Sequence, residues 1–93
     1  MDTQKDKLAF PAPALTGLTG QQLLVGAKQI RKALKNGTVR QVYLAANADP
    51  VITEPIALLC AQGGVAYAWV KSMSELGQAC GIEVGATAAA VRN

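Results

Sequence analysis

Residues 26–40, GAKQIRKALKNGTVR, hold the clearest helix of the chain and the start of the strand that follows it. Four apolar residues recur at helical spacing and share one side of the helix: Ala27, Ile30, Ala33 and Leu34. The pair Asn36-Gly37 is a typical left-handed helix stop. The pattern therefore predicts a helix over residues 27–36 and a strand over residues 39–46, with Val42, Tyr43 and Leu44 in the core.

The rest of the chain repeats this alternation of helix and strand. Further helices are predicted over residues 53–62 and 72–80, and further strands over residues 65–70 and 87–91. Thr53 is the expected cap of the first of these helices, and Ser72 with Glu75 fits a capping box for the second. Residues 87–91, TAAAV, have the propensity of a helix, but their place after two helix–strand units favours a strand. This order predicts an α/β fold in which helices cover both faces of one sheet.

The length of 93 residues suits one compact domain. Residues 1–14 mix charges with two prolines and no periodicity, and we interpret them as a flexible tail. The repeat LTGLTG places two glycines in six residues, so any helix over residues 15–23 should be short or frayed. Residues 15–93 are then expected to form the single domain.

Positive charge is concentrated in residues 26–40, which carry five bases and no acid, a charge of +5. The remaining residues carry four bases and six acids, a charge of −2, which gives the net +3 of the chain. Four of the cations fall on the side of the helix opposite its apolar residues, and we call this the basic face: Lys28, Arg31, Lys32 and Lys35. Such a face indicates a phosphate-bearing partner, and the alternative is an ordinary solvated helix surface.

The composition argues against catalysis and against bound cofactors. The chain has no histidine, so Ser-His and Cys-His pairs are excluded, and its glutamates are scattered. No cluster of metal ligands and no glycine-rich phosphate loop is present. Cys60 and Cys80 are expected to be two small buried residues without a disulfide. We therefore expect a protein that is not an enzyme and needs no metal or cofactor.

The sequence also gives expectations about location. It has no run of eighteen apolar residues and no secretory signal, so we expect a cytoplasmic protein without a membrane span. Aromatic residues make up only 4% of the chain, and most of them fall in predicted strands. Any nucleic-acid recognition should then depend on charge and shape, with limited base stacking.

The loop CGIEVG, residues 80–85, is the second unusual feature. Gly77, Gly81 and Gly85 recur every four residues, which fits either a glycine-rich helix exit or a functional loop. Ile82 and Val84 are apolar residues on a short loop, where exposure to water is unfavourable. They are expected either to tuck inward or to contact a partner.

Three segments resemble the kink-turn-binding ribosomal protein family, most closely its small bacterial ribosome-associated branch. They are VGAKQIRKALKNG (residues 25–37), LAANADP (residues 44–50) and SMSELGQACGIEVGATAAAV (residues 72–91). The likeness covers about residues 20–91 in register. It implies a three-layer α/β/α sandwich around a four-stranded mixed sheet, and binding to RNA that is sharply bent at a kink-turn.

The resemblance also implies roles for particular residues. The start of the basic helix would enter the widened groove beside tandem guanine–adenine pairs, through Gly26, Lys28, Gln29 and Lys32. The loop Ile82-Glu83-Val84 would pack against flipped-out nucleotides. The expected RNA-binding set also includes two further cations of the basic face, Arg31 and Lys35.

The chain departs from the family pattern at several positions. Lys28-Gln29 stands where archaeal relatives usually have Asn-Glu, so the bonds to guanine should differ. Ser74 and Gln78 occupy positions that are often lysine, which predicts weaker binding than in the most basic relatives. We expect a monomeric RNA-binding protein that recognises kink-turns in ribosomal or riboswitch RNA, with the large ribosomal subunit as a candidate partner. The alternative is a protein-interaction module of the same fold.

Overall fold

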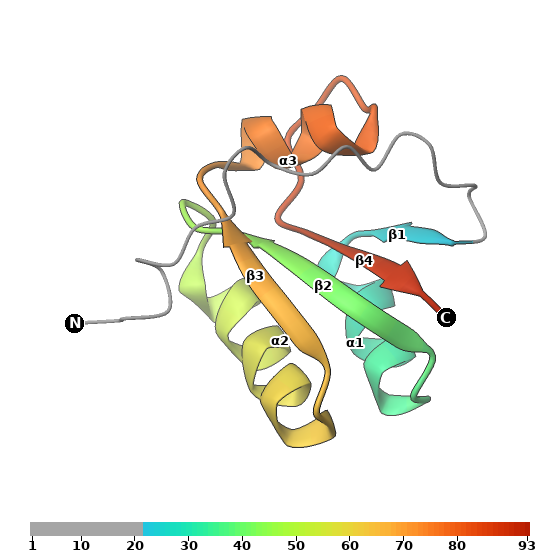
Figure 1. Ribbon diagram of the computed structural model, residues 1–93. Helices are drawn as coiled ribbons and strands as arrows, with labels where there is room; N and C mark the ends of the chain where they lie inside the picture. Colours follow the sequence, from blue (N-terminus) through green and yellow to red (C-terminus); the bar gives the residue numbers. More distant parts are fainter. Residues whose placement is uncertain (1–21) are drawn as a thin grey trace.

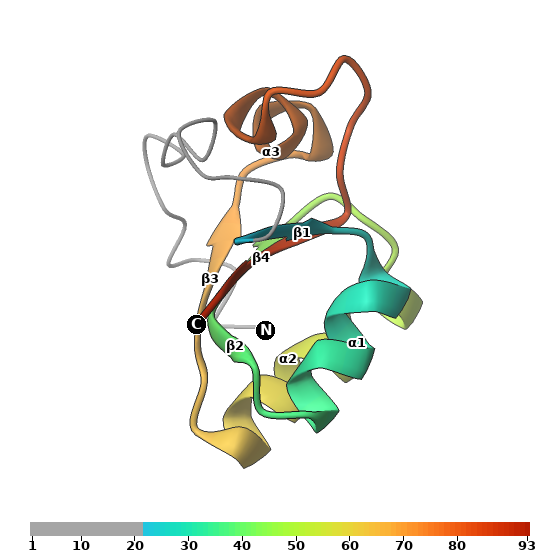
Figure 2. The same cartoon turned by 90° about the vertical axis from the view of Figure 1, so that its right-hand side faces the viewer.

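A computed structural model describes residues 22–93, which fold into three helices and four strands. The helices are α1 (Ala27–Lys35), α2 (Pro50–Gly63) and α3 (Met73–Cys80). The strands are β1 (Leu23–Val25), β2 (Val39–Ala45), β3 (Ala66–Val70) and β4 (Ala88–Arg92). α1 and α2 lie together on one face of the sheet and α3 covers the other face (Figures 1 and 2). The expected three-layer α/β/α architecture is confirmed.

The four strands form one mixed sheet in the order β1-β4-β2-β3. β2 and β3 are parallel, while β4 is antiparallel to both β1 and β2. β4 therefore occupies a central place although it comes last in the chain. Its buried segment of three alanines, residues 88–90, fits this place because small side chains let helices approach the sheet closely on both faces.

Two apolar clusters flank the sheet, and alternating residues of the central strands feed them. Val42, Leu44, Ala88 and Ala90 face the cluster under α1 and α2. Ala45 and Ala89 face the cluster under α3. Val42 and Leu44 are fully buried, as expected, whereas Tyr43 is only partly buried at the edge of the second cluster.

The start of α2 corrects one expectation. The helix begins three residues earlier than predicted, because Pro50 occupies its first turn and Asp49 caps it by accepting a hydrogen bond from the amide of Val51 at 3.0 Å. Thr53, the expected cap, is fully buried on the inner side of α2. Aspartate caps helices at least as well as threonine, and the burial of Thr53 leaves this role to Asp49.

The first described residues, at the start of β1, differ from a second expectation. A short or frayed helix is the most that the sequence allows over residues 15–23, and Leu23 instead begins strand β1 and pairs with Val91. Residues 15–21 of that prediction, and the flexible tail predicted over residues 1–14, lie outside the described residues. Pairing with β4 overrides the weak local preference of this segment.

Both cysteines are buried and free, as the sequence predicted. Burial disfavours the charged thiolate, and it raises the pKa of Cys60 from 9.0 to about 11. The pKa of Cys80 is raised for the same reason. Neither thiol is suited to act as a nucleophile at neutral pH.

Candidate nucleic-acid interface

The start of α1 leaves its backbone donors free to meet a ligand. Gly26 holds φ at 115°, a conformation that favours glycine, and its amide donates to the carbonyl of Ala88 at 3.2 Å. No side chain caps the helix, and no acid lies in its first turn. A Cβ at Gly26 would meet no heavy atom within 4 Å. The turn is thus open, and the partial positive charge of the helix start points into that open space.

The other two described helices lack this property. Asp49 caps α2, and the hydroxyl of Ser72 accepts from the amide of Glu75 at 3.1 Å at the start of α3. A complete capping box also needs the Glu75 carboxylate to accept a hydrogen bond from the amide of Ser72. The Oε2 atom of Glu75 does not do so, because it is buried without a hydrogen-bond partner in residues 22–93. α1 is therefore the described helix whose first amides are available to an anion.

The basic face lies on the exposed side of α1. Its four cations are exposed and surround a shallow hollow of about 390 Å³: Lys28, Arg31, Lys32 and Lys35. None of them forms an ion pair within the described part of the chain. Ile30 and Ala33 are buried on the opposite side of the helix. The amphipathic pattern is confirmed, and its positive charge is unneutralised by residues 22–93.

The loop between α3 and β4 is fastened to α3 by its backbone. The amide of Ile82 donates to the carbonyl of Gly77, and the amide of Ala86 donates to the carbonyl of Met73, both at 3.0 Å. A Cβ at Gly77 would collide with the carbonyl oxygen of Val84. Glycine at this position lets the loop lie directly on the helix. The four-residue glycine spacing in the sequence was the signal for this contact.

The two apolar loop residues differ: Ile82 tucks inward, as one of the two expectations had it, and contact of Val84 with a partner stays a prediction. Ile82 is half-buried against the cluster under α3, whereas Val84 is 70% exposed. Glu83, between them, is also exposed. The fixed backbone therefore displays Val84 to solvent, and a partner that covered this side chain would recover apolar burial.

A hollow of about 330 Å³ lies beside this loop. Residues from α3, the loop and the β2–α2 turn line it: Asn47, Met73, Ser74, Gln78, Ile82, Glu83, Val84 and Gly85. The side-chain oxygen of Asn47 accepts a hydrogen bond from the amide of Met73 at 2.8 Å and so joins the turn to the start of α3. Local sequence patterns do not place Asn47 or Met73 in the site, because their contact joins residues 26 positions apart.

The start of α1 and the α3–β4 loop lie on the same side of the molecule. In Figure 2 the loop forms the upper right and descends to β4 beside the start of α1, and Figure 1 shows the two in the same vertical order. The bond between Gly26 and Ala88 fixes this relation. α1 then runs away from the loop. Lys28 and Gln29 belong to the first turn, at the end of the helix towards the loop, while Lys35 lies in the last turn.

The sequence of the chain matches the model of the ribosomal protein L7Ae/L30e/S12e/Gadd45 family over residues 16–93. The chain belongs to this family. An RNA-binding protein of Bacillus pumilus is 45% identical over 71 residues, which cover 76% of this chain and 87% of that protein. The RNA-binding protein YbxF of Geobacillus stearothermophilus is 38% identical over 74 residues, 80% of this chain and 90% of that one.

Solved structures show the same fold. The 15.5kD RNA-binding protein of Giardia lamblia has a TM-score of 0.73 and 32% identity, over 78% of this chain. The chain spans 62% of the length of that protein. A Bacillus halodurans protein described as having unknown function has a TM-score of 0.72 and 27% identity, over 78% of this chain and 73% of that one.

Membership of the L7Ae/L30e/S12e/Gadd45 family agrees with the expectation of a protein that is not an enzyme, since this RNA-binding family is non-catalytic. Residues 22–93 contain no group of three or more side chains that could hold a metal ion. No helix in that range is long and apolar enough to cross a membrane.

Proposed function

We propose that this chain binds structured RNA and recognises the kink-turn, a sharp bend stabilised by tandem guanine–adenine pairs. One observation carries the proposal. The uncapped, cationic start of α1 lies on the same side of the molecule as the α3–β4 loop (Figure 2), and Val84 of this loop is exposed. A bent RNA brings phosphates and an extruded base close together, and such a surface is suited to contact both at once.

The names of the relatives support the RNA part of this proposal. Proteins from Bacillus pumilus and Geobacillus stearothermophilus are called RNA-binding proteins, and so is the Giardia lamblia protein of the same fold. The two bacterial relatives match the chain over most of their own length. The family model covers residues 16–93, which include both α1 and the α3–β4 loop.

Each part of the surface has its own task in the proposed complex. Gly26 allows the RNA backbone to approach the helix start, and the side-chain amide of Gln29 forms hydrogen bonds with the edges of guanine bases. Lys28, Arg31, Lys32 and Lys35 neutralise phosphates. The segment Ile82-Glu83-Val84 packs against the bases that leave the stack at the bend.

The physiological setting is part of the same proposal. We infer a monomer that works in the bacterial cytoplasm on ribosomal or riboswitch RNA, with the large ribosomal subunit as the leading candidate. Sedimentation of the tagged chain with ribosomal subunits at low and high salt tests this setting. Co-sedimentation with the large subunit supports it, and recovery only in the ribosome-free fraction contradicts ribosome association.

Binding to two matched RNAs tests the proposed recognition. One RNA contains a kink-turn, and in the other the guanine–adenine pairs are replaced by Watson–Crick pairs. We expect tighter binding to the first, and a fall of log affinity with log salt of slope about −2 to −4, as several neutralised phosphates require. Equal affinity for both RNAs would contradict kink-turn recognition, and a flat salt dependence would contradict phosphate binding.

A protein-interaction module of the same fold is the second candidate. The outer face of α2 favours it, because Val51 is 79% exposed and Leu58 is 58% exposed on the same helix. Such a module would bind both RNAs weakly and equally. Its binding to a protein partner would be lost on placing a charge at Leu58, a change that should leave RNA binding intact.

A further inference from the structure

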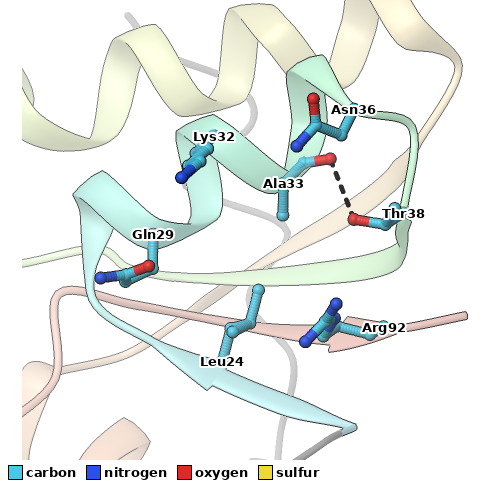
Figure 3. A pocket seen from close by; sticks show the side chains of 7 residues that line it. All are labelled: Leu24, Gln29, Lys32, Ala33, Asn36, Thr38 and Arg92. Carbon is cyan, nitrogen blue, oxygen red and sulfur yellow. Dashed lines mark hydrogen bonds between the residues drawn. The ribbon is translucent and has the colours of Figure 1, made fainter.

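A groove separates α1 from β1 and β4; it begins at Gln29, in the first turn of α1, and extends to Arg92 at the end of β4. Its volume is about 220 Å³. Figure 3 shows Gln29, Lys32 and Asn36 along one side of α1, above Leu24 of β1 and Arg92 of β4. Arg92 lies 60 residues after Lys32 in the sequence, so only the fold brings the two cations to one groove.

The walls of this groove are held in place by backbone contacts. The amide of Arg92 donates to the carbonyl of Gln22 at 2.7 Å, and the next amide, of Asn93, donates to the carbonyl of Thr38 at 3.0 Å. The hydroxyl of Thr38 donates to the carbonyl of Ala33 at 3.2 Å and ties the turn to α1. The backbone that carries Arg92 is therefore anchored on both sides of the groove.

The chemistry of the groove favours an anion. Lys32 and Arg92 are exposed and form no ion pair within residues 22–93, and the other polar side chains are two amides and a hydroxyl. The four acids of the described residues belong to other parts of the fold: Asp49, Glu54, Glu75 and Glu83. Amide and guanidinium donors together match the oxygens of a phosphate.

The groove adjoins the hollow of the basic face at Lys32, which lines both. Six residues separate Gly26 from Lys32, which corresponds to about 9 Å along the helix axis. The rise per nucleotide is about 3.4 Å in a B-form strand and shorter in the A-form stem of an RNA, so a strand that started at the helix start would reach the groove after roughly two to four nucleotides. The groove is thus placed to meet a phosphate of the stem beside the bend.

We propose that Lys32 and Arg92 form a phosphate site for the RNA stem that flanks the proposed recognition site. This inference rests on the proposed RNA-binding function and extends its footprint to the end of β4. The phosphate is bound between α1 and β4, so Arg92 adds affinity for the stem without reading the bent bases.

Two matched variants test the site in the full chain. Arg92→Gln removes one charge from the groove, and Arg40→Gln removes the same charge from an exposed residue of β2 that does not line it. We expect Arg92→Gln to weaken RNA binding roughly threefold to tenfold at low salt and to reduce the salt slope by about one unit. Arg40→Gln should change neither as much. Equal effects of the two variants would overturn the proposal.

A neutral methylphosphonate at single stem positions identifies the phosphate. The effect of Arg92→Gln should disappear for the RNA whose contacted phosphate is neutral, at about the second to fourth nucleotide from the bend. An effect that persists at every position would overturn the assignment to the stem. Titration with inorganic phosphate, monitored by the NMR signal of the Arg92 side chain, tests whether the site binds free phosphate instead of the phosphate of an RNA stem. Binding of inorganic phosphate combined with unchanged RNA binding of Arg92→Gln would also overturn the proposal.

The ratio of affinities for kinked and Watson–Crick RNA distinguishes failure of the kink-turn proposal from failure of the Arg92 phosphate site. Arg92→Gln should lower both affinities by the same factor and leave the ratio unchanged. If wild-type protein shows no preference for the kinked RNA, the proposed recognition fails while the charge effect at Arg92 is still measurable. If the preference is present and Arg92→Gln has no effect, only the phosphate site is wrong.

Discussion

The backbone of Gly77 in α3 lies against the carbonyl of Val84, so closely that a Cβ at position 77 would collide with the Val84 oxygen. The same Cβ would stand 3.2 Å from the Cα of Gly85. Val84 is exposed because the loop cannot sink further towards the helix. This contact links a helix residue with no side chain to the apolar side chain that we assign to RNA binding.

Gly77→Ala should therefore displace the loop. We expect a loss of about 1–3 kcal/mol in the free energy of unfolding, as for other overpacked sites, and weaker binding to kinked RNA. Chemical denaturation and gel shift measure the two effects. Gly63→Ala is the matched control, because its Cβ would meet only a side-chain atom of Val65 at 3.8 Å. Equal stability of the two variants would contradict the close packing of the loop.

Val84→Asp should reduce RNA affinity without unfolding the protein. Val84 is 70% exposed, so its replacement should change stability by less than about 0.5 kcal/mol. The new charge should cost about 1–3 kcal/mol of binding free energy, comparable to the loss of one base contact. Val51→Asp, at a valine of α2 that is 79% exposed, is the control and should bind normally. Normal RNA binding by Val84→Asp would contradict the assignment of the α3–β4 loop to the RNA interface.

Lys32→Ala should weaken binding to all RNAs by a similar factor. A lysine that contacts phosphate contributes affinity independent of sequence, so the salt slope should fall by about one unit. Fluorescence anisotropy over a series of salt concentrations measures both quantities for the kinked and the Watson–Crick RNA. A change confined to one of the two RNAs would show that Lys32 reads bases instead of phosphates.

Cys60 should make stability depend on alkaline pH. Its pKa is 9.0 when exposed and about 11 in the fold, so the unfolded chain loses this proton first as the pH rises. The unfolded state then binds fewer protons than the native state, and stability should fall between about pH 9 and pH 11. Denaturation of wild type and Cys60→Ala at several pH values tests this. The decline should be smaller in the variant, and parallel curves would contradict the raised pKa.

Local patterns in the sequence were sufficient to predict most of the fold. The apolar spacing in residues 27–36 predicts α1 within one residue, and Ser72 marks the start of α3. The start of α2 was misplaced because Thr53 is also a good cap; Pro50 in the first turn fits Asp49 as the cap, and the burial of Thr53 in the fold agrees with it. That burial depends on tertiary packing, which a local pattern does not contain.

The candidate site was only partly predictable for a similar reason. Residues 26–35 form one helix, so their charge pattern could be read directly. Arg92 joins Lys32, and Asn47 joins Met73, through the order of the strands and helices in space. Contacts between segments this far apart require the topology, in which β4 inserts between β1 and β2.

The central claim is that the start of α1 distinguishes bent from straight RNA, and Gln29 is the residue that tests it most directly. The measurement is the ratio of affinities for the kink-turn RNA and its Watson–Crick counterpart, in wild-type protein and in Gln29→Ala. We predict a clear preference for the kink-turn in wild type that falls by about 1–3 kcal/mol in the variant, with the salt slope unchanged. An identical ratio in both proteins would contradict this account of recognition.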